Sequence, residues 1–177
     1  MLLEMLDVAA GDWVVQNAAN GAVGKALAML ARARGVNVLN LVRREEGIEE
    51  MAAQGIGNTV CTMHEGWKAQ ARDLMGGARP KAAVDSVSGP ASGVLCSLLG
   101  ENGLLVSFGS MTGESMQIPS GELIFKQITV KGFWGTPASK ALSSQDRRRL
   151  MGELMQRAAS GELQLPVAAT HGFEDIA

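Results

Sequence analysis

Two glycines follow the first apolar run of the chain at a spacing that suits phosphate binding. The run Trp13–Gln16 leads into Asn17-Ala-Ala-Asn-Gly21-Ala-Val-Gly24, and a helix-forming segment starts directly afterwards. A diphosphate binds where backbone N–H groups point at it from the N-terminus of a helix, and glycine lets the backbone approach closely. Any tight turn between a strand and a helix can use glycine, but the position after the first strand favours a dinucleotide site. Its candidate residues are Asn20, Gly21, Ala22, Val23 and Gly24.

A pair of arginines ends the second apolar run, about 20 residues beyond the glycine turn, where a dinucleotide-binding fold contacts the adenosine ribose. The run closes with Leu41-Val-Arg43-Arg44-Glu45. NAD-specific sites usually place an acidic residue at this position, whereas a 2′-phosphate calls for arginine. Arg43, with Arg44 beside it, therefore predicts NADPH as the cofactor. The alternative is that both arginines only decorate the start of a helix, where Glu45 and Glu46 neutralise them.

Two further strand ends should reach the same edge of the sheet, because the carboxyl ends of parallel strands meet there. They are the small-residue turns Asp85–Gly89 and Ser107–Met111. Either turn could line the nicotinamide ribose and ring, or it could be only a compact connection. No catalytic residue can be assigned, because Ser86, Ser88 and Ser110 lack an evident histidine partner and the chain contains no tyrosine.

Short β-branched runs alternate with longer amphipathic stretches along the chain, which is typical of a parallel sheet with crossover helices. We expect strands at residues 13–16, 36–42, 59–62, 82–87, 104–108 and 128–133, and helices at 23–34, 45–54, 67–75, 91–99 and 144–159. Ser143 or Ser144 can cap the last helix, and Gly161 follows its end. Right-handed crossovers then favour an α/β fold, a Rossmann-type, doubly wound sheet of six parallel strands in the order 3-2-1-4-5-6.

The composition argues against several other classes of protein. With 177 residues the chain is long enough for one domain, and 46% hydrophobic against 19% charged residues suits a globular fold. A net charge of −2 without a basic patch makes nucleic acid an unexpected partner. The apolar runs fall far below the roughly 20 residues of a membrane span, and the N-terminus lacks a signal-peptide pattern. We therefore expect no membrane association.

Neither the cysteines nor the histidines form a metal-binding pattern. Cys61 and Cys96 lie in apolar runs without a CxxC spacing, and His64 and His171 have no ligand partner three or four residues away. We predict no metal site, two ordinary loop histidines and two reduced thiols. Reduced thiols in turn indicate a cytoplasmic protein.

Three segments together resemble one branch of a known superfamily. They are Gly11–Gly24, the strand end Asn40–Arg44 and Leu123–Trp134, of which the last, with its Phe-Lys…Lys-Gly-Phe-Trp pattern, is the most specific. From about Gly11 to Ala177 the chain resembles the quinone oxidoreductase branch of the medium-chain dehydrogenase/reductase superfamily. Within that branch it is most similar to the mitochondrial-type trans-2-enoyl-CoA (enoyl thioester) reductases. The resemblance implies a zinc-independent, NADPH-dependent oxidoreductase.

The resemblance also implies roles for individual positions. Asn20 to Val23 would contact the diphosphate of NADPH, and Arg43 its 2′-phosphate. The positions on the nicotinamide side would be Phe108, Gly109, Ser110 and Met111, and those at the cofactor and the mouth of the substrate pocket would be Phe133, Trp134, Gly135 and Thr136. At Glu45 the reductases often have a second basic residue, so this position departs from the pattern of the family.

The family also has parts that this sequence does not contain. Its members carry an N-terminal GroES-like domain, with a tyrosine that positions or protonates the substrate, and their chain returns to that domain after the Rossmann unit. Residues 1–177 would then be the NADP(H)-binding Rossmann domain alone, truncated at both ends, with residues 173–177 beginning another helix. Family members dimerise edge to edge, which implies a homodimer through the strand at 128–133.

Three interpretations of the function stay open at this point. In the first, the chain is the cofactor-binding domain of an NADPH-dependent reductase of the C=C bond in enoyl thioesters, and is inactive or weak alone. The second keeps the fold and changes the small-molecule substrate to a quinone or another activated alkene. The third is a non-catalytic interaction module whose exposed former domain interface binds a partner.

Overall fold

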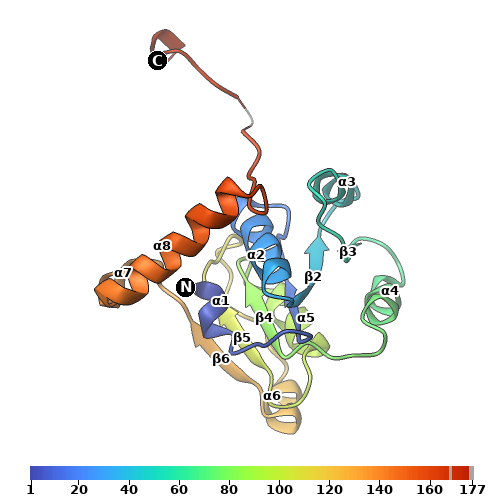
Figure 1. Cartoon of the computed structure of the whole chain (residues 1–177). Helices are drawn as coiled ribbons and strands as arrows, with labels where there is room; N and C mark the ends of the chain where they lie inside the picture. The colour runs from blue at the N-terminus through green and yellow to red at the C-terminus, as the bar shows by residue number, and fades with distance from the viewer. Residues whose placement is uncertain (168, 176–177) are drawn as a thin grey trace.

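The computed structural model describes residues 1–167 and 169–175 and contains one sheet of six parallel strands (Figure 1). The strand order is β3-β2-β1-β4-β5-β6, so the direction in which strands are added reverses between the central strands β1 and β4. The strands are β1 (Trp13–Gln16), β2 (Asn37–Val42), β3 (Thr59–Cys61), β4 (Ala82–Asp85), β5 (Leu104–Ser107) and β6 (Thr129–Gly132). The predicted doubly wound α/β fold is confirmed, and its switch point lies between β1 and β4.

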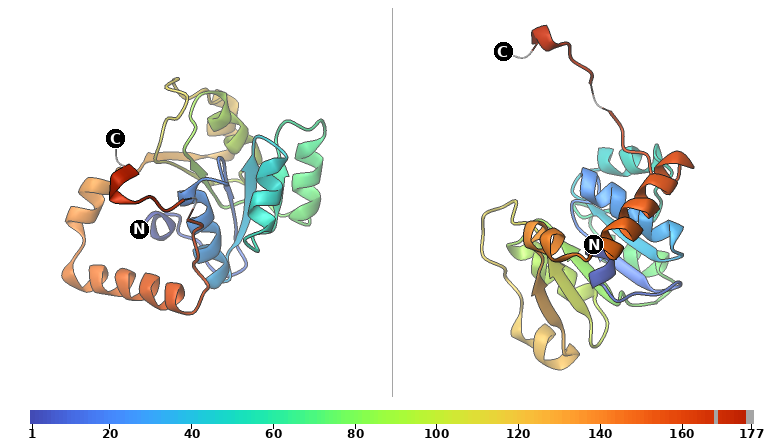
Figure 2. Two further views of the ribbon diagram at one scale, coloured as in Figure 1. Left: turned by 90° about the horizontal axis from the view of Figure 1, so that it is seen from above. Right: turned by 60° about the vertical axis from the view of Figure 1, so that its left-hand side comes forward.

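Helices cover both faces of the sheet (Figures 1 and 2). They are α1 (Leu2–Met5), α2 (Ala22–Ala33), α3 (Glu46–Ala52), α4 (Trp67–Leu74), α5 (Pro90–Leu98), α6 (Ser120–Lys126), α7 (Gly135–Ala141) and α8 (Ser144–Ala159). Side chains of α4, α5 and α6 pack on one face, and those of α1, α2 and α3 belong to the clusters on the other. Helix α8 lies outside α2, away from the sheet (Figure 2).

The central strands are buried on both faces, which explains their continuous apolar sequence. Successive side chains of a strand point to opposite faces, so Val14 joins the cluster with α1 and α2, and Val15 joins the cluster with α4 and α5. In β4, Ala83 and Val84 divide in the same way. The carboxyl ends of these strands are therefore held in a fixed frame.

The structure differs from the sequence prediction mainly in three short helices that were not expected, α1, α6 and α7. None of them spans more than two turns, which is too short for an apolar repeat of helical period to be recognised in the sequence. Helix α7 also contains Gly135 and Pro137, which are unusual in helices. The five expected helices are present with small shifts at their ends. The predicted boundaries of α8 are confirmed, because the Ser143 hydroxyl accepts the Asp146 N–H at 3.0 Å and Gly161 follows with φ +79°.

Strand β6 forms one edge of the sheet and differs from the others in its exposure. It pairs with β5, and all four of its residues are exposed, whereas Ile128 just before it is buried. A 3-10 turn spans Phe173–Asp175, where a further helix was expected, and residues 176–177 of that expectation lie outside the described residues. No helix in the described part of the chain is long and apolar enough to cross a membrane.

Candidate functional site

A cleft of about 650 Å³ opens at the carboxyl edge of the sheet, over the ends of β1 to β4. Its walls come from the turn after β1, the ends of β2 and β3, helices α3, α4 and α5, and the loop after β5. The lining residues are Asn17, Ala18, Asn20, Leu41, Val42, Arg43, Arg44, Glu46, Gly47, Glu50, Thr62, Trp67, Val87, Ala91, Val94, Leu95, Met111 and Thr112. This position, beside the switch point, is where α/β sheets of this type bind ligands.

The two glycines of the turn after β1 have different reasons to be glycine. A methyl group on Gly24 would lie 2.4 Å from the carbonyl oxygen of Ala19 and 2.7 Å from its Cα, so helix α2 could not approach the turn. Gly21, the N-cap of α2, has an ordinary φ of −73°, and its methyl group would lie 3.3 Å from the Ala18 oxygen. The fold therefore demands glycine at Gly24 and only favours it at Gly21.

The first turn of α2 directly follows Asn20, which lines this cleft, but Gly21, Ala22 and Val23 are not among the lining residues, and Val23 instead lines a hollow between α2 and α8. Gly21, Ala22 and Val23 are all exposed, and no side chain of the described residues caps the helix. The first N–H groups of a helix have no partner inside it and carry the positive end of the helix dipole. In this twelve-residue helix they can therefore bind an anion without displacing a protein acceptor.

A buried hydrogen-bond network joins the ends of β1 and β4 beneath the cleft. Asp85 is fully buried and accepts the Asn17 side-chain amide at 2.7 Å, the N–H groups of Val87 and Ser88 at 2.9 and 3.0 Å, and the Ser92 hydroxyl at 2.6 Å. The Asn17 amide oxygen in turn accepts the Ser86 N–H at 2.9 Å. The network fixes both turns at the switch point.

A second buried network joins β1 to α2 and β2. The side-chain amide of Gln16 donates to the carbonyl oxygen of Gly24 at 2.9 Å and to the side-chain oxygen of Asn40 at 2.7 Å. Asn40 donates to the carbonyl oxygen of Gly57, in the loop before β3, at 2.8 Å. The glycine turn and the end of β2 are thus tied to one framework.

Arg43 and Arg44 follow β2 and are exposed along the cleft. Glu45 is bonded to His64 instead, and neither arginine has an ion-pair partner among the residues that the structure describes. Within the described residues, neither Glu45 nor Glu46 forms an ion pair with them, and the choice between a phosphate-binding role and a helix-start role for the arginines stays a prediction. Glu46 and Glu50 line the α3 side of the cleft, and Glu50 accepts the Asn20 amide at 3.0 Å. The arginines are the basic groups of a cleft that is otherwise polar and acidic on this side.

The sequence profile described as "zinc-binding dehydrogenase" matches residues 22–154, more than half of the chain. The chain belongs to the zinc-binding dehydrogenase family. Its similarity to "Enoyl-[acyl-carrier-protein] reductase, mitochondrial" of Caenorhabditis elegans reaches 32% identity over 180 residues, covering 100% of this chain and 52% of that protein. The chain thus spans about half the length of this relative.

Solved structures share the fold over most of this dehydrogenase-family chain. The enoyl thioester reductase Etr1p, as a mutant in complex with NADP and crotonyl-CoA, is 25% identical with a TM-score of 0.79, over 94% of this chain and 48% of that one. Etr1p of Candida tropicalis is also known in a heterodimer with Etr2p (24% identity, TM-score 0.79, 94% of this chain and 50% of that one). A quinone oxidoreductase of Pseudomonas syringae is 26% identical with a TM-score of 0.76, over 94% of this chain and 51% of that one.

Only some of the predicted site residues of this family member meet in the cleft. Those in its lining are Asn20, Arg43, Arg44 and Met111. Phe108 and Phe133 instead pack, half-buried, against the core cluster around α1 and α2. Trp134 caps α7 and is 74% exposed, so with Gly135 and Thr136 it lies beyond the cleft, at the carboxyl end of β6. Their predicted roles concern a nicotinamide and substrate region, which stays a prediction.

The loop after β5 is positioned by the loop after β4. A methyl group on Gly109 would lie 3.0 Å from the carbonyl oxygen of Ser86, the same oxygen that accepts the Met111 N–H at 3.1 Å. Thr112 donates twice to the carbonyl oxygen of Val87, from its N–H at 3.1 Å and from its hydroxyl at 3.0 Å. The two turns predicted at residues 85–89 and 107–111 therefore contact each other and form one unit. Turns that only connect neighbouring elements would not need these contacts.

Sequence reasoning missed the wall of the cleft formed by α4 and α5. Val87 lies within the turn 85–89 that was predicted to reach this edge, whereas Thr62 was not singled out, although its place after the end of β3 could have identified it. Trp67, Ala91 and Val94 lie on helices, and they reach the cleft only through the order of the strands.

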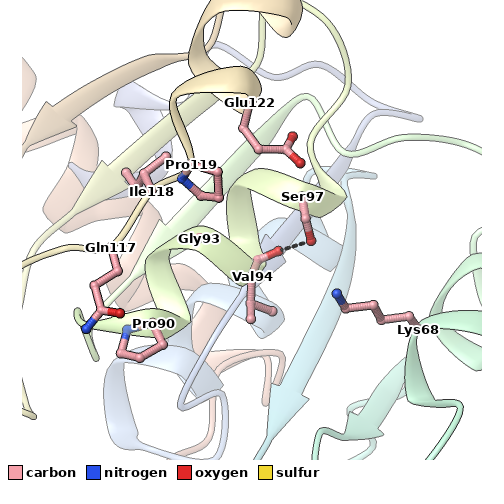
Figure 3. Close-up of a pocket in the computed structure, with 9 residues that line it drawn as sticks. All are labelled: Lys68, Pro90, Gly93, Val94, Ser97, Gln117, Ile118, Pro119 and Glu122. Atoms are coloured by element: carbon pink, nitrogen blue, oxygen red, sulfur yellow. Dashed lines mark hydrogen bonds between the residues drawn. The ribbon is translucent and has the colours of Figure 1, made fainter.

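A separate groove of about 520 Å³ lies on the flank of the sheet, between α4, α5 and the segment leading into α6 (Figure 3). It is lined by Lys68, Pro90, Gly93, Val94, Ser97, Gln117, Ile118, Pro119 and Glu122. The Ser97 hydroxyl donates to the carbonyl oxygen of Val94 at 2.7 Å within α5. This groove lacks the glycine turn and the arginines, so we take the cleft at the sheet edge as the functional site.

Among the residues that the structure describes, the remaining chemistry-bearing side chains form no second site. Burial raises the pKa of the Cys96 thiol to about 11, so the thiol stays protonated at neutral pH. Ser86 and Ser88 donate to Asn17 and to the carbonyl oxygen of Glu114. Within the described residues, no group of three or more His, Cys, Asp or Glu side chains could hold a metal ion.

Proposed function

We propose that this chain is the NADPH-binding half of a reductase that adds hydride to the activated C=C bond of a 2-enoyl thioester. The C. elegans relative is named as an enoyl reductase, and Etr1p was solved with NADP and crotonyl-CoA. Because this chain spans about half of either protein, the site for the thioester would be shared with a part outside residues 1–177. The chain alone is then expected to bind cofactor with little turnover.

The observation that carries the proposal is that the arginines after β2 line the cleft and that the uncapped start of α2 directly follows Asn20, which also lines it. NADPH needs anion binding at its diphosphate and at its 2′-phosphate, which lie on opposite sides of one ribose. The N–H groups of Ala22 and Val23 suit the diphosphate, and Arg43 and Arg44 suit the phosphomonoester. Buried networks hold both elements on the same framework.

When bound, NADPH supplies a hydride for the β-carbon of the enoyl group. The residues of this chain would hold and orient the cofactor so that the nicotinamide lies toward the ends of β4 and β5. Phe108 to Met111 and Phe133 to Thr136 lie on that side of the sheet. The proton for the α-carbon would come from outside the residues discussed, since Ser86 and Ser88 are engaged in hydrogen bonds.

Calorimetric titration of the chain with NADPH and NADH tests the cofactor assignment. Removing the Arg43 guanidinium removes charged hydrogen bonds to the 2′-phosphate, so Arg43→Ala should weaken NADPH binding about 10- to 100-fold and leave NADH binding unchanged. Arg148→Ala, at an exposed position of α8, is the matched control and should change neither affinity. Equal affinity of the wild-type chain for NADPH and NADH would contradict the proposal.

A quinone is the second candidate substrate, since the P. syringae structure is of a quinone oxidoreductase with the same fold. Both substrates accept a hydride at an activated double bond, and the cofactor cleft would serve either. Assays of a complete reductase that includes this chain, with a crotonyl thioester and with a soluble quinone, would separate them. If the quinone is reduced faster than the crotonyl thioester, the quinone becomes the proposed substrate.

An interaction module without catalysis is the third candidate, and the exposure of apolar side chains favours it. Val23, Met111 and Trp134 are 50%, 75% and 74% exposed, respectively, although they flank the carboxyl edge of the sheet. Light scattering with and without NADPH separates this idea from the first. A species of constant size that binds cofactor stoichiometrically would remove the support for a module.

We further infer a homodimer through β6, since this edge strand is exposed along its whole length. Joining two such edges would extend the sheet across both copies. Etr1p occurs in a heterodimer with Etr2p, which shows that its fold can pair two chains. Sedimentation at several concentrations should show a dimer, and a monomer throughout would end this inference.

The compartment is proposed from the thiols. Cys61 and Cys96 are buried and free, which fits a reducing compartment such as the cytoplasm. The C. elegans relative is named as mitochondrial, so fractionation of cells that express this chain at its natural level would decide between the two compartments.

A further inference from the structure

The cleft has a polar side and an apolar side. The phosphates of the proposed cofactor would contact only the polar side. The polar side, next to α2 and α3, carries Asn20, Arg43 and Glu50. The apolar side, next to α4 and α5, carries Trp67, Val87, Ala91, Val94 and Leu95. A flat, weakly polar group would be stabilised on the apolar side by burial and by contact with an aromatic ring.

Trp67 is the aromatic residue of this cleft, and no other aromatic side chain of the described residues lines it. It is the first residue of α4 and follows Gly66, whose φ of +81° turns the chain into the helix. The indole is half-buried and packs against the core cluster that contains Ala71 and Leu95. Its position is therefore set by the core rather than by a mobile loop.

The indole also stands between two hollows. Trp67 lines the cleft, and its neighbour Lys68 lines the groove on the flank of the sheet, while Val94 lines both. The ammonium group of Lys68 lies 5.8 Å from the centroid of the indole, within the range of a cation–π contact. Figure 3 shows Lys68 extending from α4 toward Val94 and α5. Lys68 thus supports the ring from the groove, and the cleft remains for a ligand.

We propose that Trp67 forms the outer wall of a subsite for the adenine base of the cofactor and contributes to the affinity for that base. This inference rests on the proposed NADPH function, because Arg43 at the end of β2 sets the position of the ribose. From there the base can turn toward α3, where Glu46 and Glu50 lie, or toward α4 and α5. An uncharged heterocycle favours the second side, where Trp67 and Val94 enclose it.

Adenosine 2′,5′-bisphosphate, which lacks the nicotinamide, is the probe for this subsite. Trp67→Ala should weaken its binding and that of NADPH about tenfold, the effect typical of losing one base-stacking side chain. Trp67→Phe should keep most of the affinity and lose most of the quenching of tryptophan emission that the probe causes in the wild-type chain. Leu74→Ala, at an exposed position of the same helix, is the control for a general effect on α4.

The outcomes separate the two proposals. The role of Trp67 would be overturned if the wild-type chain binds NADPH and Trp67→Ala binds it with the same affinity. Full quenching of tryptophan emission in Trp67→Phe would overturn it as well. Either result would leave the proposed function standing. Failure of the wild-type chain to bind either ligand would overturn both. If Trp67→Ala unfolds at a lower temperature, the Phe variant decides, because a purely structural role predicts normal quenching by the probe.

Discussion

Two regions of this molecule are attached to the sheet in opposite ways. At the switch point, the turns after β1 and β4 are joined by Asp85, a fully buried carboxylate whose hydrogen bonds all stay within the protein. Helix α8, by contrast, has no buried residue along its fully described length. It is held by ion pairs of Glu153 with Arg34, the residue that follows α2, at 2.6 Å, and of Arg149 with Glu4 of α1, at 3.1 Å.

The two kinds of attachment differ in how closely they fix the geometry of the region that they hold. A buried network that is fully satisfied permits one geometry, because each lost bond leaves a polar group without water. Partly exposed ion pairs tolerate displacement, because water and salt can replace them. The cofactor cleft is built on the first kind of region, and α8 is fastened by the second.

The largest expected effect comes from removing the carboxylate at the switch point. Asp85→Ala leaves two backbone N–H groups, an amide and a hydroxyl without an acceptor, and should lower the free energy of unfolding by about 4 kcal/mol in urea denaturation. Asp73→Ala, at an exposed position of α4, is the control and should stay within about 0.5 kcal/mol of the wild type. A loss below about 1 kcal/mol for Asp85→Ala would erase the contrast between the two regions.

An intermediate effect is expected at the glycine turn. Gly24→Ala forces a methyl group against the backbone of Ala19 and should cost about 2–3 kcal/mol by thermal unfolding. Gly21→Ala is the matched variant, three residues away, and should cost less than about 1 kcal/mol because its methyl group meets a single oxygen at 3.3 Å. If both variants were equally stable, the close approach of α2 would not be what selects glycine.

The smallest effect is expected at α8, and it depends on pH. The hydrogen bond from Arg34 holds the pKa of Glu153 at about 2, below its ordinary value of 4.5. A lowered pKa stabilises the fold fully above about pH 4.5, and this contribution is lost as the pH falls toward 2. Because the two side chains are 22% and 28% exposed, we expect only about 1 kcal/mol from the pair at neutral pH.

Glu153→Gln should therefore lower the melting temperature at pH 7, and its difference from the wild type should shrink below about pH 4.5 and vanish near pH 2. Glu65→Gln, at an exposed loop position, is the control for a loss of one negative charge. A difference that persists undiminished at pH 2 would show that the ion pair is not its source.

Local sequence signals were sufficient for most of the fold and for the basic half of the cleft. Short apolar runs ended by glycine or arginine located the strands and placed Gly21, Gly24 and Arg43 near one edge, since parallel strands share their carboxyl ends. The cap at Ser143 followed from a hydroxyl placed before a polar helix. These features depend on a few neighbouring residues.

The rest depends on contacts between distant parts of the chain. The partner of Asp85 is Asn17, 68 residues earlier, and the pairing exists only because β1 and β4 are neighbours. Trp67 likewise reaches the cleft only because β3 lies beside β2 and α4 covers that face. No periodicity in the sequence encodes either contact, and α7, with Gly135 and Pro137, shows no helical pattern at all.

A crystal structure of the chain with NADPH is the most direct test of the central claim, that the carboxyl edge between α2 and β2 holds the cofactor. The account predicts density in the cleft, with the diphosphate at the N–H groups of Ala22 and Val23 and the 2′-phosphate against Arg43. Cofactor density elsewhere on the molecule, or a 2′-phosphate directed away from Arg43 into solvent, would contradict it.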